Sequence, residues 1–247
     1  MIPLHDPDLI RRRTPYVTIA IIAVNVLVSV TTLLFLSDLR ELEAIYRFGA
    51  IPGVLTGGEG FGVVQVAPRV TVDLTSPLPA VMTIFTSMFM HAGWMHLSGN
   101  MVYLWVFGDN IEDRLGHMRY LLFYLAAGAI AVGAHVASGP GSGVPMIGAS
   151  GAVAGVLGGY IVLHPKSRIT TLIIMGFIFS VRLPALLLLG GWMVFQVFFG
   201  AASLAVTDDG GGVAYFAHVG GFAAGAATFA VLRASRSTSA DSQPRLF

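Results

Sequence analysis

Residues 148–163 read GASGAVAGVLGGYIVL, an apolar stretch without any charged side chain. Gly151, Gly155 and Gly159 recur in it at every fourth position, and residues spaced four apart lie on one face of a helix. A face of glycines lets two membrane helices pack with their backbones in contact. The stretch therefore predicts a short membrane helix that packs closely against another helix.

A matching pattern lies in residues 213–232, near the other end of the chain. His218, Gly221 and Gly225 fall on one helix face there, because they are three or four residues apart. We expect this segment to be the partner of the first glycine face. Packing along the two faces would bring His218 towards Ser150.

The composition agrees with a chain that lies mostly in lipid. Of its 247 residues, 55% are hydrophobic and 11% are charged, and its mean hydropathy is +0.78. A soluble domain has about 25% charged residues, so a soluble enzyme is excluded, and disorder would need low hydrophobicity. The net charge of +1 supplies no basic field for nucleic acid, and the absence of cysteine excludes disulfides and thiolate chemistry.

Apolar windows long enough to cross a bilayer recur along the chain. We predict an all-α, polytopic membrane protein with a six-helix bundle, whose spans are 16–36, 93–111, 118–137, 148–163, 184–205 and 213–232. The apolar segment 169–180 is nearer to half a bilayer in length, so we interpret it as an interfacial helix. Arg11, Arg12 and Arg13 precede the first span, which is longer than a signal-peptide core and is not followed by a small-residue cleavage site, so we expect that span to be retained.

The distribution of basic residues predicts the orientation of the bundle. With six spans and the N-terminus in the cytoplasm, the outer side holds only Arg40, Arg47 and Arg69 of the 14 Lys and Arg residues. Basic residues concentrate on the cytoplasmic side of membrane proteins. The count therefore favours six spans with both termini inside.

The chain divides into three parts on this interpretation. Residues 1–15 form a short cytoplasmic segment, and residues 16–232 form the membrane domain. Its outer loop, 37–92, is too long for a mere connection, so we expect it to be partly embedded in the membrane or to act as a flap. Residues 233–247 are polar and Ser-rich, which predicts a disordered cytoplasmic tail.

Polar side chains inside apolar spans are costly and suggest function. His96 and Asn100 share one helix face, and both can donate hydrogen bonds. Taken alone, they could simply form hydrogen bonds between helices. Ser150 opens a helix after a Gly-rich loop, where a serine is usually an N-cap. Yet free N–H groups at a helix start also stabilise an oxyanion. With His218 nearby, Ser150 could be a nucleophile activated by a base.

Other catalytic arrangements find less support in the sequence. No Asp or Glu lies in a span centre, so the most that it offers is a Ser–His dyad rather than a Ser-His-Asp triad. The zinc-protease motif H-E-x-x-H is absent, and we predict neither a metal nor a cofactor. A transporter would show ionisable residues along a path or two internal repeats, and we find neither.

Three motifs, taken in order, resemble the rhomboid intramembrane serine proteases. They are HAGWMHLSGNMVYLWVFGDNIEDRLG, GASGAVAGVLGG and AHVGGFAAG, and the resemblance extends over residues 83–230. It implies a six-helix core whose site opens outward, in a bacterial inner membrane, with Ser150 as nucleophile and His218 as general base. It further implies that His96, Asn100 and the Ser150 backbone N–H donate to the oxyanion, and that Glu112 and Arg114 tie helix ends together.

Two features depart from the family pattern. Ala154 stands where many relatives carry an aromatic residue that stacks on the catalytic histidine, and Phe216 or Tyr215 could fill that space. The outer loop has Tyr46-Arg47 in place of a Trp-Arg pair. Neither departure removes a catalytic group.

The expected partners are the lipid bilayer and transmembrane protein substrates that approach from it, without nucleic acid. The alternative within the same fold is an inactive relative that binds membrane clients. The oligomeric state stays open.

Overall fold

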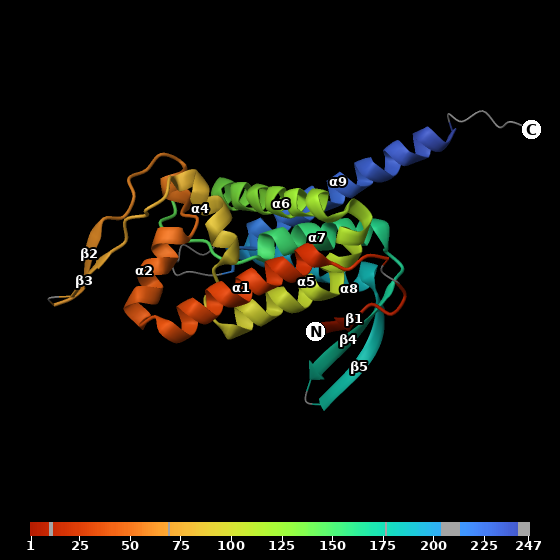
Figure 1. The fold of residues 1–247 in the computed structure, drawn as a ribbon, viewed down its shortest axis with the longest axis horizontal. Coiled ribbons are helices and arrows are strands. Elements are labelled where there is room, and N and C mark those ends of the chain that lie inside the picture. Colours follow the sequence, from red (N-terminus) through yellow and green to blue (C-terminus); the bar gives the residue numbers. More distant parts are fainter. Residues whose placement is uncertain (10–11, 69, 176, 204–212, 242–247) are drawn as a thin grey trace, which may run out of the picture.

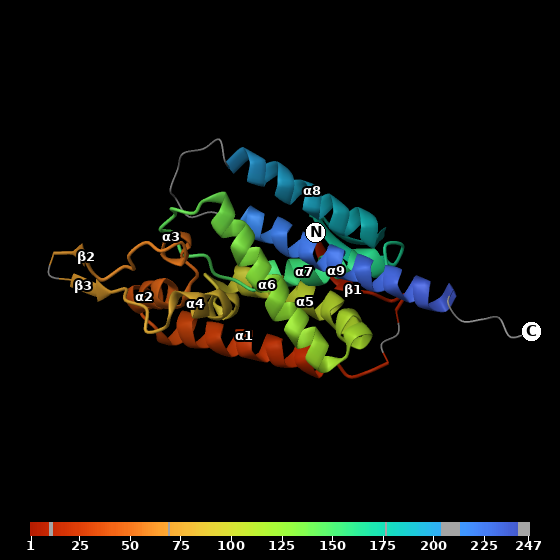
Figure 2. The ribbon, with the colours of Figure 1, turned by 90° about the horizontal axis from the view of Figure 1, so that it is seen from above.

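The computed structural model describes residues 1–9, 12–68, 70–175, 177–203 and 213–241, and this part of the chain is mostly helical. Its long helices coincide with the six predicted spans. They are α1 (Tyr16–Phe35), α5 (Trp94–Leu115), α6 (His117–Ser138), α7 (Ser150–Leu163), α8 (Ala185–Ser203) and α9 (Tyr215–Asp241). Figures 1 and 2 show them as one bundle, with α8 at its periphery beside α9.

Four helices in the described part of the chain are long and apolar enough to cross a membrane, namely Tyr16–Phe35, His117–Ser138, Ala185–Ser203 and Tyr215–Ser235. Helix α7 is equally apolar but has only 14 residues, and α5 carries charged residues in its last two turns. The prediction of a polytopic helical membrane protein is confirmed. The number of crossings and the orientation stay predictions.

Helix α7 is the centre of the bundle. Every residue from Gly151 to Tyr160 is buried, and α5, α6 and α9 enclose the helix (Figure 2). A methyl group added at Gly221 or Gly225 would overlap the backbone carbonyl of Gly151 or Gly155. The two glycine faces therefore pack backbone to backbone, as membrane helices with small residues do.

The glycines of α7 also contact α6, which the sequence pattern did not indicate. A Cβ at Gly151 would lie 2.5 Å from the Cβ of Ala131, and one at Gly155 would lie 2.5 Å from that of Ala127. A Cβ at Gly159 would instead lie 2.6 Å from the ring of Phe229 on α9. Because α7 is wedged between two helices, one stripe of glycines serves both interfaces.

The long outer loop is folded rather than open. It contains α2 (Asp38–Phe48), α3 (Pro52–Leu55), β2 (Val63–Ala67), β3 (Val70–Asp73), α4 (Ala80–Thr86) and a 3₁₀ turn, Ser87–Phe89. Strands β2 and β3 pair antiparallel and extend away from the bundle (Figure 1). The remainder is joined to the loop before α7, because Gly148 N–H donates to Ser87 O at 2.9 Å and Ala50 N–H to Met146 O at 3.0 Å.

The prediction of an interfacial helix over 169–180 is wrong. The chain forms an antiparallel hairpin there, with β4 (Arg168–Met175) and β5 (Phe177–Pro184). The N-terminal strand β1 (Ile2–His5) adds to β4, which gives the sheet order β1-β4-β5. The segment is rich in the β-branched residues Ile, Thr and Val, which fit a pleated strand better than a helix.

The C-terminal tail also differs from its prediction. Helix α9 continues to Asp241, so residues 233–241 are helical rather than disordered. The rest of the predicted disordered tail, 242–247, lies outside the described residues.

Buried carboxylates tie the helix ends opposite Ser150. Glu112 on α5 accepts hydrogen bonds from the N–H groups of Val17 and Thr18 at 2.9 and 2.8 Å, and from His117 Nδ1 at 2.6 Å. Asp6 accepts from Tyr160, and from Ser167 Oγ at 2.9 Å. Glu112 thus joins α1, α5 and α6, which agrees with its expected tying role.

Candidate active site

Ser150 is the first residue of α7, at the end of the helix that faces the outer loop. The chain enters the helix through Gly148, whose φ of +121° is disfavoured for residues with a Cβ. A Cβ at Gly148 would also lie 2.7 Å from the His96 ring. The glycine therefore permits the turn that presents Ser150 beside the unpaired N–H groups of the first helical turn.

His218 lies in the first turn of α9 and is hydrogen-bonded to Ser150. Its Nε2 lies 2.8 Å from Ser150 Oγ, and only 8% of the residue is exposed. Both residues begin their helices at the same end of the bundle, and the glycine contacts hold α7 and α9 close enough for the two side chains to meet. The arrangement is that of a nucleophile with its base.

The other ring nitrogen of His218 has a partner on a third helix. His218 Nδ1 lies 2.8 Å from Oε1 of Gln196 on α8, and Gln196 is 6% exposed. Gln196 is not among the site residues predicted from the sequence. A signal existed, because a buried amide in an otherwise apolar span is costly.

The aromatic residue beside His218 is Trp192, one turn before Gln196 on α8. Its ring centroid lies 5.5 Å from that of His218, with an interplanar angle of 37°. The expectation that Phe216 or Tyr215 fills the space next to Ala154 is wrong. Both of those side chains pack towards Gly200 instead.

His96 and Asn100 on α5 complete the site. Together with Ser150 and His218 they line a cavity of about 220 Å³, whose other walls include Trp192 and Ala154. Asn100 Nδ2 donates to the backbone oxygen of His96 at 2.9 Å, and the His91 ring packs edge-on against His96, with 5.0 Å between centroids. The structure therefore gathers all four predicted polar residues around one cavity.

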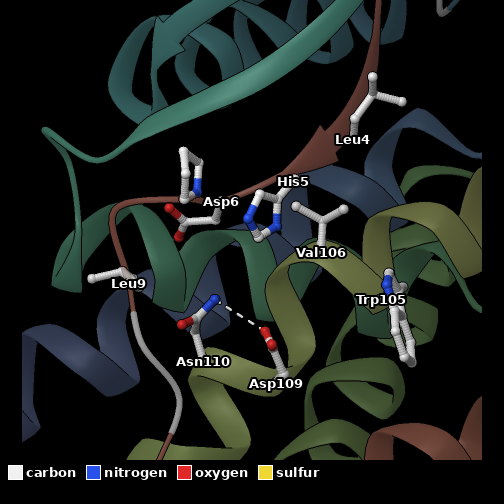
Figure 3. Close-up of a pocket in the computed structure, with 9 residues that line it drawn as sticks. Leu4, His5, Asp6, Leu9, Trp105, Val106, Asp109 and Asn110 are labelled. Atoms are coloured by element: carbon white, nitrogen blue, oxygen red, sulfur yellow. Dashed lines mark hydrogen bonds between the residues drawn. The ribbon is translucent and has the colours of Figure 1, made fainter.

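A second cavity lies at the opposite end of α5 (Figure 3). His5 and Asp6 from the N-terminal segment border it, together with Trp105, Asp109 and Asn110 from α5. Ser150 is not part of its lining. Within the described residues, no group of three or more His, Cys, Asp or Glu is placed to hold a metal ion.

The chain is similar to known proteins over the part that carries this site. The family model that matches is the Rhomboid domain, over residues 79–235. The Rhomboid protease GluP of Bacillus subtilis (strain 168) is 38% identical over 85 residues, which are 34% of this chain and 16% of that protein. The Rhomboid-like protein 11, chloroplastic, of Arabidopsis thaliana is 41% identical over 81 residues, 32% of this chain and 28% of that protein.

A longer alignment joins the chain to the RHOMBOID-like protein 12, mitochondrial, of Arabidopsis thaliana, which is 32% identical over 170 residues, 62% of this chain and 47% of that protein. The chain thus spans less than half the length of each of these three relatives. The family model matches more than half of the chain, and it includes all of α5, α6, α7 and α8 and most of α9. This integral, multi-pass membrane protein therefore belongs to the rhomboid family.

Proposed function

We propose that this chain is an intramembrane serine endopeptidase, with Ser150 as nucleophile and His218 as general base. The observation that carries the proposal is the 2.8 Å contact between Ser150 Oγ and His218 Nε2 inside a cavity. Nucleophile and base within hydrogen-bond reach are the signature of covalent catalysis. The name of the Bacillus relative, a rhomboid protease, supports the same activity.

The reaction follows from the positions of these groups. Ser150 Oγ attacks the scissile carbonyl carbon while its proton passes to His218 Nε2. The imidazolium then protonates the departing amine, which leaves an acyl ester on Ser150. A water molecule, deprotonated by His218, hydrolyses that ester and regenerates the serine.

The negative charge of each tetrahedral intermediate needs donors. The Ser150 backbone N–H lies at the helix start, and the side chains of His96 and Asn100 line the same cavity. We assign these three groups to the oxyanion. Removing one such donor from a serine protease costs about 2.7–4 kcal/mol of transition-state stabilisation.

The length of α7 supports a site below the membrane surface. Fourteen residues at 1.5 Å each give a helix of about 21 Å, against about 30 Å for the hydrocarbon core. Substrates are then transmembrane proteins that arrive through the lipid. Segments with Gly, Pro or Ser near the outer end of a span are preferred, because their backbone is more easily released from helical hydrogen bonds.

The charges support the orientation. Arg114, Lys166, Arg182 and Arg233 flank helix ends on the side of the bundle opposite Ser150. The positive-inside rule then places Ser150 towards the outer face of the membrane and the termini in the cytoplasm. We assign the chain to a bacterial inner membrane, an assignment that the Bacillus relative supports.

The test is cleavage of a fluorogenic transmembrane substrate in proteoliposomes. We expect turnover by the parent, and none by Ser150→Ala or His218→Ala variants that keep the parental circular dichroism and elution volume. A fluorophosphonate probe should label Ser150 only when His218 is present. A parent that neither cleaves nor labels would refute the proposal and favour the alternative, an inactive relative that binds membrane clients.

A further inference from the structure

Gln196 is a buried amide in a helix that has little other polarity. Helix α8 reads ALLLLGGWMVFQVFFGAAS, and the only other uncharged polar groups in it are the Trp192 indole N–H and a serine at its last position. Placing an amide in an apolar surrounding without a partner is unfavourable by several kcal/mol in hydrocarbon. The Gln196 side chain is buried, and its partner is the ring of His218.

The chemistry of this contact determines which ring nitrogen carries the proton. An amide oxygen only accepts hydrogen bonds, so with Gln196 Oε1 towards the ring the donor in the 2.8 Å contact is His218 Nδ1. In neutral imidazole the other nitrogen is then an acceptor. Nε2 therefore presents its lone pair to the Ser150 hydroxyl, which is the tautomer that a general base needs.

Two side chains of α8 jointly hold the imidazole in place. Trp192 and Gln196 are four residues apart and so lie on one helix face. The indole packs against the ring of His218, with 5.5 Å between centroids, while the amide binds its Nδ1 edge. Packing and hydrogen bonding therefore restrict both the tilt and the rotation of the ring.

We propose that Gln196 is a positioning residue that fixes the tautomer and orientation of His218, so that the Ser150–His218 pair works with a third, orienting residue rather than as an isolated dyad. The proposal rests on the proposed function. In soluble serine proteases an Asp does this task. A neutral amide suits a site at membrane depth, because an ionised carboxylate would lose its hydration there.

The proposal is tested with two substitutions of Gln196 that have nearly the same size. Gln196→Leu removes the acceptor, and Gln196→Glu retains an acceptor oxygen. Val194→Leu is the matched control, because Val194 is on the same helix but exposed on its outer surface. We expect Gln196→Leu to lower kcat by about 10- to 100-fold with KM unchanged. This loss is smaller than the roughly 10⁴-fold loss when a triad Asp is replaced by Asn, because a neutral group orients the ring without supplying charge.

Rescue separates positioning from simple packing. Gln196→Glu should have a kcat at least about threefold above that of Gln196→Leu, although leucine suits an apolar helix better than glutamate. Parental kcat in Gln196→Leu would overturn the proposal. Equal losses in the two variants would overturn it as well.

A second readout does not depend on cleavage. Chain labelled with ¹⁵N-histidine and reconstituted in bilayers reports the tautomer of each ring, and the spectrum of His218→Gln identifies the His218 signals. We expect a single Nδ1–H tautomer in the parent and in Val194→Leu, and a mixture of both tautomers in Gln196→Leu. An unchanged tautomer in folded Gln196→Leu would overturn the proposal even if the chain were inactive. The failure of the proposed function is thereby distinguished from the failure of this one.

Discussion

A single methyl group at Gly221 should separate the two halves of the candidate site. The Cβ of alanine there would overlap the carbonyl oxygen of Gly151 and would lie 3.0 Å from its carbonyl carbon. Neither partner is a flexible side chain, so α7 and α9 must move apart by on the order of 1 Å to restore ordinary contact. The Ser150–His218 separation of 2.8 Å would grow to about 3.8 Å, which is too long for a hydrogen bond.

A displacement of that size lowers the rate by roughly 100-fold, whereas overpacking destabilises a protein by about 1–3 kcal/mol. Gly221→Ala should therefore lose most of its turnover in proteoliposomes while it remains folded in detergent. Gly133→Ala is the control, because a Cβ at Gly133 on α6 would have no atom within 4 Å. Parental turnover in Gly221→Ala would show that the contact between α7 and α9 does not set the Ser150–His218 distance.

Three further predictions concern other parts of the chain. Glu112→Ala should lower the free energy of unfolding by about 2–3 kcal/mol, because buried N–H donors lose a charged acceptor; denaturation in micelles measures this, and Glu59→Ala in the exposed part of the outer loop should change little. Gly148→Ala should abolish fluorophosphonate labelling, because an alanine is strained at the positive φ and meets the His96 ring; unaltered labelling would contradict this. Reporter fusions after residues 168 and 233 should both give cytoplasmic signals, and a periplasmic signal at residue 233 would refute six spans.

The helices could be predicted from the sequence because hydropathy alone delimits them. A segment that crosses lipid must satisfy its own backbone hydrogen bonds, so long apolar windows become helices. The predicted span of 118–137, for example, differs by one residue at each end from α6 (His117–Ser138). The proximity of Ser150 and His218 was also accessible, because glycine spacing indicates which helix faces meet.

The parts that sequence reasoning missed depend on contacts between distant residues. The hairpin of β4 and β5 is completed by β1, which is about 165 residues away in the sequence, and hydropathy does not distinguish a short apolar helix from an apolar strand. The role of Gln196 becomes visible only once α8 is placed beside His218, because the hydrogen bond between them joins two different helices. Trp192 on α8 likewise packs against His218, whereas the aromatic residues predicted to do so, Phe216 and Tyr215, belong to α9.

The enclosure of α7 has a consequence for how this sequence can drift during evolution. At Gly155 the main obstacle to a larger residue is the side-chain methyl of Ala127, 2.5 Å from the new Cβ, while the carbonyl oxygen of Gly221 lies farther away, at 3.3 Å. A second substitution, of Ala127 by glycine, would remove it, so positions 155 and 127 should covary among relatives. At Gly158 the obstacle is the backbone carbonyl of Phe222, which no substitution can remove. An alignment of relatives should therefore show correlated substitutions at positions 155 and 127, but an invariant glycine at position 158.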